Sequence, residues 1–183
     1  MITPELEMAS GTYVSLTDPQ PATILLSDIA HALSLICRFG GHGKRFYSVA
    51  EHAVRVAKRM HENLYEDDEV FAALHHDDTE AYLGDVPSPL KSLLGGYREL
   101  ETKFNLVISH ALDFDADLTH TPALKDTDHY LLHQEARQLM VSKGAQNYGP
   151  RPHVRPLDGP IGWTTDTARE AFLQMHYDLC PPF

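Results

Sequence analysis

The chain has 183 residues, of which 43% are hydrophobic and 22% charged, a composition typical of a globular domain that buries a substantial core. The net charge of −11 excludes a surface built to coat a nucleic-acid polymer, because such a surface needs clustered Lys and Arg. No apolar run approaches the roughly 18 to 20 residues of a membrane span, and residues 1–5 lack the features of a secretory signal. We therefore expect one domain, residues 1–183, located in the cytoplasm and without a membrane partner.

The predicted elements are mostly helices. Weak alternation over residues 11–17 indicates a short strand or an extended arm. Apolar residues at helical spacing predict a helix over 27–37, with Ser27 or Asp28 as its cap. Further helices are expected at 49–63, 67–83, 97–112, 121–142 and 166–179, with a Pro-stiffened loop at 85–91 and an irregular Gly- and Pro-rich stretch at 144–164. The expected fold class is all-α, a compact helical bundle with at most a short N-terminal arm or hairpin.

The helix that follows Ser48 carries a buried stripe and one histidine. Ser48 and Glu51 have the spacing of a capping box, in which the Ser hydroxyl accepts from an N-terminal amide and the Glu side chain reaches back. The stripe expected to face the core consists of Val49, Ala53, Val56 and Met60. His52 lies on that side, where an imidazole is either hydrogen-bonded within the core or bound to a metal.

Residues 72–80 contain the most informative motif of the chain, the pair His76-Asp77 with Glu80 three residues later. On one continuous helix His76 and Glu80 share a face, and Asp77 lies between them. This arrangement indicates half of a metal site whose other ligands lie elsewhere in the chain. His75 points about 100° away from His76 on an ideal helix, so we expect it not to reach the same ion.

The helix expected over 121–142 places a carboxylate on its apolar stripe. Asp128 shares that stripe with Leu124 and Leu131, and a carboxylate is costly to bury without a cation or strong donors. Asp128 is therefore another candidate ligand. Glu135 also faces inward, and we expect it either to support a ligand or to form a buried ion pair with an arginine such as Arg137.

The order His52, His76-Asp77, Asp128 resembles the HD-domain phosphohydrolase superfamily. Other segments resemble its small bacterial and phage branch, which includes deoxynucleoside 5′-nucleotidases and phage dATP triphosphohydrolases. These segments are 28–30, 36–42, 46–52, 76–82, 84–91 and 125–128. The resemblance covers roughly residues 22–142, whereas residues 144–183 match only loosely through a closing helix. It implies an HD-domain helical bundle and the cytoplasm of a bacterium or of a phage-infected host cell.

The resemblance implies one divalent metal ion per chain, held by His52, His76, Asp77 and Asp128. Mn²⁺, Co²⁺, Zn²⁺ and Fe²⁺ all accept such nitrogen and oxygen ligands, and Mg²⁺ is a further option. A homo-oligomer, either a dimer or a hexamer, is also implied.

Two acidic residues are expected to take part in catalysis. Glu80 is the candidate that orients or deprotonates the attacking water, and its alternative is a salt bridge on the surface. Asp85 matches a family position near the phosphate and that water, and its alternative is a cap for the loop after Gly84.

The resemblance also implies the residues that bind substrate. Arg38, Lys91 and Lys125 are placed around the phosphates, where Arg offers a planar fork and Lys a mobile charge. Their alternative is ordinary solvated surface charge. Phe39 matches a position where a ring meets the base, and its alternative is a core phenylalanine.

The implied function is metal-dependent phosphohydrolysis of deoxynucleotides, with dATP triphosphohydrolase activity that releases deoxyadenosine as the leading candidate. A broad-specificity 5′-nucleotidase acting on deoxynucleoside monophosphates is the alternative within the same class. Two alternatives are not phosphohydrolases. One is a di-iron oxygenase, for which His110 and His120 would supply extra ligands, and the other is a non-catalytic nucleotide sensor.

Overall fold

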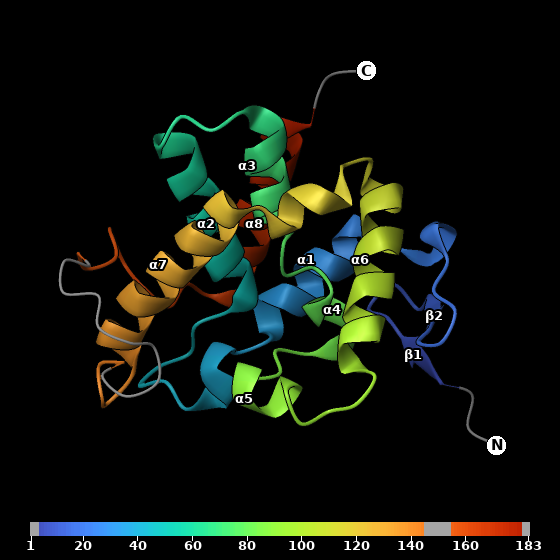
Figure 1. Ribbon diagram of the computed structural model, residues 1–183, viewed down its shortest axis with the longest axis horizontal. Coiled ribbons are helices and arrows are strands. Elements are labelled where there is room, and N and C mark those ends of the chain that lie inside the picture. The colour runs from blue at the N-terminus through green and yellow to red at the C-terminus, as the bar shows by residue number, and fades with distance from the viewer. Residues whose placement is uncertain (1–3, 145–154, 181–183) are drawn as a thin grey trace.

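A computed structural model of the chain describes residues 4–144 and 155–180, and this part is predominantly helical (Figure 1). The strands β1 (Glu5–Glu7) and β2 (Tyr13–Ser15) form an antiparallel hairpin. The helices are α1 (Leu26–Leu35), α2 (Val49–Glu62), α3 (Asp67–Leu74), α4 (Glu80–Leu83), α5 (Ser88–Lys91), α6 (Tyr97–Leu112), α7 (Pro122–Leu139) and α8 (Thr165–Leu179). The 3₁₀ helices are η1 (Pro21–Thr23), η2 (Arg38–Gly41) and η3 (Ala116–His120). The predicted all-α class with a short hairpin is confirmed. None of the described helices combines the length and the apolar character needed to cross a bilayer.

Helix α2 is the centre of the bundle and packs against α1, α3, α7 and α8 (Figure 1). The four stripe residues Val49, Ala53, Val56 and Met60 have no exposed surface, so the predicted core face is confirmed. The helix begins where predicted, because the Ser48 hydroxyl accepts a hydrogen bond of 3.1 Å from the Glu51 amide. The first turn of α2, which carries His52, is thereby fixed.

The Glu51 side chain does not complete the predicted capping box. Its buried carboxylate instead accepts from Arg55 at 2.8 Å and from the backbone amides of Gly162 and Trp163 at 3.1 and 2.7 Å. A buried charge takes its strongest available donors, and the two backbone amides come from a segment more than 100 residues later in the chain. The contact ties the stretch before α8 to the start of α2.

The predicted continuous helix over 67–83 is wrong. Helix α3 ends at Leu74, residues 75–79 form turns, and α4 begins at Glu80. Side chains compete with the helical backbone here: His75 contacts the Asp78 carboxylate at 2.7 Å, and His76 Nδ1 lies 2.7 Å from the Ala73 carbonyl. The His-Asp motif therefore occupies a tight turn, not a helical face.

Two smaller expectations are corrected, and a third is confirmed for the residues that the structure describes. The N-cap of α1 is Leu25, and Asp28 lies inside the first turn, where it accepts from Ser10. The Pro-stiffened loop contains the short helix α5. Of the stretch expected to be irregular, residues 155–164 contain no helix or strand, and 145–154 lie outside the described residues.

His75 belongs to a buried polar chain that joins the motif turn to α8. Its Nδ1 lies 2.7 Å from Asp78, its Nε2 lies 2.9 Å from His176 Nδ1, and its ring contacts Phe71, Phe114 and Phe172. His75 is thus turned away from His76, as expected. Burial, and secondly the neighbouring His75, lower the pKa of His176 to about 4.

The low pKa of His176 makes the stability of the fold depend on pH. The unfolded chain binds a proton at this residue below about pH 6.5, whereas the folded chain does so only near pH 4. The contribution of His176 to the free energy of unfolding is therefore complete above about pH 6.5 and is lost as the pH falls to 4, by roughly 3 kcal/mol at most. We expect chemical denaturation at stepped pH values to show this loss in the wild type and a smaller one in His176→Gln. The variant His61→Gln, at an exposed position, should follow the wild type, and equal pH slopes for all three would contradict the assignment.

Candidate metal centre

Three side chains from two segments converge to form a site of metal-binding size. His52 comes from the first turn of α2, and His76 and Asp77 come from the turn between α3 and α4. One ligand atom of each lies within 4.8 Å of the other two. Two imidazoles and a carboxylate are ligands that first-row divalent metals accept. The described residues thus bring together three of the four predicted ligands.

Each of the two imidazoles directs one buried nitrogen into the site. His76 Nε2 has no hydrogen-bond partner among the residues that the structure describes, and His52 Nε2 faces only carboxylates, of which Asp128 lies nearest at 3.1 Å. Their opposite nitrogens are held, that of His52 by Glu135 at 2.5 Å and that of His76 by the Ala73 carbonyl at 2.7 Å. A histidine that binds a metal usually anchors its second nitrogen on a carboxylate or a backbone carbonyl in this way. The residues present therefore fit a divalent ion.

Glu135 on α7 joins the site to its surroundings. Its fully buried carboxylate contacts three groups: His52 Nδ1, the Tyr47 hydroxyl at 2.9 Å and Arg38 Nε at 3.3 Å. The prediction that Glu135 supports a ligand agrees with this geometry, and the arginine it contacts is Arg38. Tyr47 could not be identified from the sequence, because its residue type alone does not distinguish a hydrogen-bonding role from an apolar one.

The charges around His52 pull its pKa in opposite directions. Burial and the Arg38 guanidinium disfavour the imidazolium, but Glu135 and Asp128 outweigh them and raise the pKa of His52 to about 10. A bound divalent cation requires the neutral imidazole, because the ligating nitrogen must be deprotonated. Four carboxylates lie in or beside this site, those of Asp77, Asp128, Glu135 and Glu80, so it is prepared for positive charge.

Asp128 lies at the rim of the site and is not the buried carboxylate that its stripe predicted. Its side chain is 38% exposed, and its Oδ1 lies 3.1 Å from His52 Nε2. Burial opposes its ionisation, but the contact with His52 and the charges of His76 and Arg38 lower the pKa of Asp128. Asp128 thus faces the same nitrogen that would bind the ion, although it does not belong to the compact group of three.

Glu80 and Asp85 lie beside the metal group. Glu80 is buried, one of its oxygens has no hydrogen-bond partner among the described residues, and the other lies 4.0 Å from Lys91 Nζ. Burial, and then the charges of Asp77 and Asp85, raise the pKa of Glu80 well above its usual value. Burial likewise raises the pKa of Asp85. A divalent cation nearby would act in the opposite direction on both groups.

The predicted phosphate-binding residues are not equally placed. Arg38 lies between two site carboxylates, with Nη1 3.2 Å from Asp77 and Nε 3.3 Å from Glu135. Lys91 pairs with Glu101 at 2.7 Å within reach of Glu80. Lys125 is an exposed residue of α7. Arg38 and Lys91 are therefore brought to the site, and the structure shows no contact between Lys125 and the metal group.

Phe39 stands beside Arg38 in an unusual backbone conformation. Its φ of 59° is in the left-handed region, where a phenylalanine is strained. The ring is partly exposed, with the Arg38 guanidinium 5.9 Å from its centroid. The strained backbone thus holds a partly exposed ring next to the charged site.

The extra histidines that a di-iron site would need are not in this group. His110 near the end of α6 and His120 at the end of η3 are both exposed, and among the described residues the metal-sized group contains only His52, His76 and Asp77. The geometry therefore favours a single ion.

The chain was compared with known proteins. No protein-family model matches it. It is similar to the uncharacterized protein YfdR of Escherichia coli strain K12, with 42% identity over 122 residues, which are 67% of this chain and 65% of YfdR. It is also similar to the uncharacterized protein RCAP_rcc00048 of Rhodobacter capsulatus, with 35% identity over 140 residues, which are 72% of this chain and 71% of that protein. The chain thus matches just under two thirds of the length of YfdR and more than two thirds of the length of the Rhodobacter protein.

Removal of a ligand nitrogen should remove the metal. We expect His76→Ala to lower the metal content of purified protein from about one divalent ion per chain to near zero, because two of the three grouped ligands cannot hold an ion tightly. Elemental analysis after dialysis measures this content. The control His110→Ala changes an exposed histidine and should keep the metal. Metal retained in His76→Ala at the level of the control would show that the group does not bind it.

The Glu135 network should tune metal affinity. We expect Glu135→Gln to weaken metal binding by about 10- to 100-fold, because the anchor of His52 loses its charge. Tyr47→Phe removes one neutral donor and should cost only about 1 kcal/mol of stability with a smaller change in affinity. Competition with a chelator measures the affinity, and circular dichroism verifies the fold. An unchanged affinity in folded Glu135→Gln would refute the anchoring role.

Proposed function

We propose that this chain, which belongs to the same protein family as RCAP_rcc00048 of Rhodobacter capsulatus, is a metal-dependent phosphohydrolase of deoxynucleotides. The observation that carries the proposal is that two buried nitrogens, His52 Nε2 and His76 Nε2, converge on Asp77 while their opposite nitrogens are anchored by Glu135 and the Ala73 carbonyl. The motifs that resemble HD-domain phosphohydrolases lie at the same residues. Geometry and resemblance thus support the same metal centre independently.

The proposed chemistry divides between the ion and the side chains. When bound, a divalent ion supplies Lewis acidity toward a phosphate oxygen and lowers the pKa of water. His52, His76 and Asp77 would hold it, with Asp128 at the open rim as a fourth candidate. Glu135 keeps His52 oriented through Nδ1, so the ligating nitrogen stays directed at the centre.

Glu80 is the proposed group that takes the proton from the attacking water. It is buried beside the metal group and has one oxygen without a hydrogen-bond partner among the described residues. A base in that position needs a free oxygen aimed at the reacting water. Asp85 lies near Glu80 and Asp77, and we propose that it orients the water and the phosphate. Lys91 lies 4.0 Å from Glu80 and can balance the charge of the phosphate.

Phosphate and base binding are assigned to the turn after α1. Arg38 contacts Asp77 and Glu135, and a cation that neutralises Asp77 would release the Nη1 donor toward phosphate. Phe39 offers a partly exposed ring for a nucleobase. The residues of segments 36–42 and 46–52 resemble those of phage dATP triphosphohydrolases, so we propose dATP as the preferred substrate. We propose the cytoplasm as the location, because deoxynucleotides are found there.

A substrate panel tests the proposed activity. Protein loaded with Mn²⁺, Co²⁺ or Zn²⁺ is incubated with each of the four deoxynucleoside triphosphates and monophosphates, and the released nucleoside, phosphate and triphosphate are quantified. We expect dATP to give deoxyadenosine and triphosphate. Equal rates for all four bases would remove the adenine preference, and release from monophosphates alone would favour a 5′-nucleotidase. No release from any of them would refute hydrolysis.

Substitution of the proposed base separates catalysis from metal binding. We expect Glu80→Gln to lower kcat by about 10²- to 10⁴-fold while the metal content stays at about one ion per chain. The matched control Glu99→Gln lies at an exposed position of α6 and should leave kcat unchanged. A Glu80→Gln variant with normal kcat would exclude this carboxyl as the base.

A further inference from the structure

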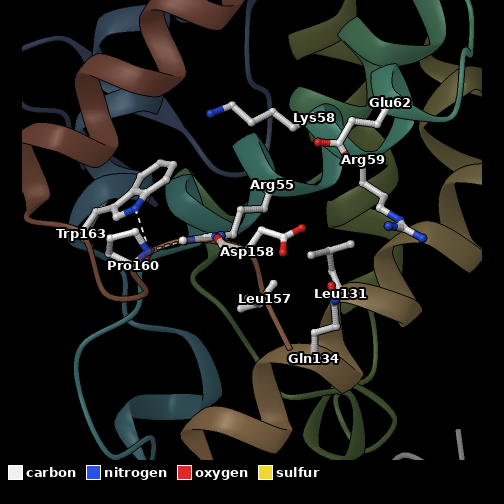
Figure 2. Close-up of a pocket in the computed structure, with 11 residues that line it drawn as sticks. Arg55, Lys58, Arg59, Glu62, Leu131, Gln134, Leu157, Asp158, Pro160 and Trp163 are labelled. Atoms are coloured by element: carbon white, nitrogen blue, oxygen red, sulfur yellow. Dashed lines mark hydrogen bonds between the residues drawn. The ribbon is translucent and has the colours of Figure 1, made fainter. Parts of the chain in front are cut away.

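A cavity lies outside the metal centre, against the later turns of α2. Its volume is about 370 Å³, and it is lined by residues of α2, α7 and the segment 157–163. In Figure 2, Trp163 and Pro160 stand on one side, Leu131 and Gln134 on the other, and Arg55 and Asp158 between them. The volume lies within the range of small-molecule sites.

Positive charge gathers in this cavity although the chain as a whole is acidic. Three basic residues, Arg55, Lys58 and Arg59, line it, in a protein with a net charge of −11. Arg55 is largely used, because it makes four hydrogen bonds, two to Glu51 and one each to the carbonyls of Asp158 and Pro160. The two remaining cations are therefore the ones open to a ligand.

Lys58 and Arg59 contact aromatic rings and not carboxylates. Lys58 Nζ lies 5.6 Å from the Trp163 ring centre, and Arg59 Cζ lies 4.4 Å from that of Tyr130. Within residues 4–144 and 155–180, neither forms an ion pair with an acidic side chain. A cation held over a ring keeps its N–H donors for an anion, so this pair is prepared to bind a phosphate.

The other walls select the rest of the ligand. Leu131 and Leu157 are nearly buried and, with the Trp163 indole, give an apolar face suited to a planar ring. Glu62 and Asp158 also line the cavity. Carboxylates repel a polyphosphate chain but accept from the N–H groups of a nucleobase. One phosphate and one base-sized ring therefore fit better than a triphosphate.

The segment that closes the cavity is held firmly by neighbours of the metal centre. Glu51, next to His52, accepts from the amides of Gly162 and Trp163. Gln134, next to Glu135, donates to the carbonyls of Arg155 and Pro156. The wall is thus fixed before any ligand arrives, which lowers the cost of binding.

From these observations we propose that the cavity between α2, α7 and residues 157–163 is a second binding site, for a nucleoside 5′-monophosphate, separate from the metal centre. Lys58 and Arg59 bind the phosphate, and the ring lies against Leu131, Leu157 and Trp163. Asp158 and Glu62 accept from the base. The site needs no metal.

The single tryptophan of the chain lines this cavity, so its fluorescence reports occupancy directly. Metal-free protein is titrated with deoxyadenosine 5′-monophosphate, deoxyadenosine, inorganic phosphate and tripolyphosphate. We expect a saturable change with the monophosphate and a dissociation constant at least about tenfold higher for each of the other three, since each lacks the phosphate or the ring or meets Glu62 and Asp158. No saturable change with the monophosphate, or equal affinity for inorganic phosphate alone, would overturn the proposal.

Variants assign the signal to this cavity. Lys58→Ala/Arg59→Ala should weaken monophosphate binding by at least about tenfold. The charge-matched control Lys44→Ala/Arg98→Ala, at two exposed positions, should stay within about twofold of the wild type. An unchanged titration in the Lys58/Arg59 variant, with its fold verified by circular dichroism, would place the ligand elsewhere and overturn the proposal. His76→Ala should keep the titration whether or not it hydrolyses nucleotides, so this result stands or falls apart from the proposed activity.

Discussion

The carboxylate of Glu135 must be surrounded by donors, because a charge with no exposed surface is tolerated only when it is paired. It contacts the His52 ring and the Tyr47 hydroxyl and forms an ion pair with Arg38, and these residues come from α2 and the part of the chain before it. This requirement joins α7 to the first half of the chain. It also orients the His52 ring, so that Nε2 points toward His76 and Asp77.

Helix α2 serves two structural demands at adjacent residues. Glu51 turns to the segment before α8, and His52 turns to the metal centre. Both side chains are buried, so the helix cannot rotate toward one without disturbing the other. The Ser48 cap fixes where the helix begins and thereby fixes both at once.

Much of the fold could be predicted because it follows apolar periodicity. The bounds of α6 agree with the prediction, and α2 and α8 differ from it by one residue. Periodicity failed at residues 75–79, where contacts of His75 and His76 outcompete the helical backbone. Those side chains are visible in the sequence. The contact between His75 and His176 is not, because the two residues are 101 positions apart in the chain.

The site was predictable in its residue types and less so in its geometry. His52, His76 and Asp77 come together as expected, whereas Asp128 is 38% exposed at the rim, which its position on an apolar stripe did not predict. Glu51 shows the same limit, since a capping box describes only neighbours in sequence. Its distant partners, the amides of Gly162 and Trp163, depend on how the chain returns from α7 to α8.

Where the segment before α8 passes Phe46, the backbone conformation at Gly162 is narrowly restricted. Gly162 has a φ of +82°, and a Cβ there would lie 2.8 Å from the Phe46 carbonyl oxygen. The segment before α8 therefore passes along one narrow track while its amides occupy Glu51. If this segment detached, the buried Glu51 carboxylate would lose two hydrogen-bond donors. The start of α8 therefore cannot unfold independently of the first turn of α2. Helix α8 and the first turn of α2, which carries His52, then belong to one cooperative unit, so that local unfolding of one destabilises the other.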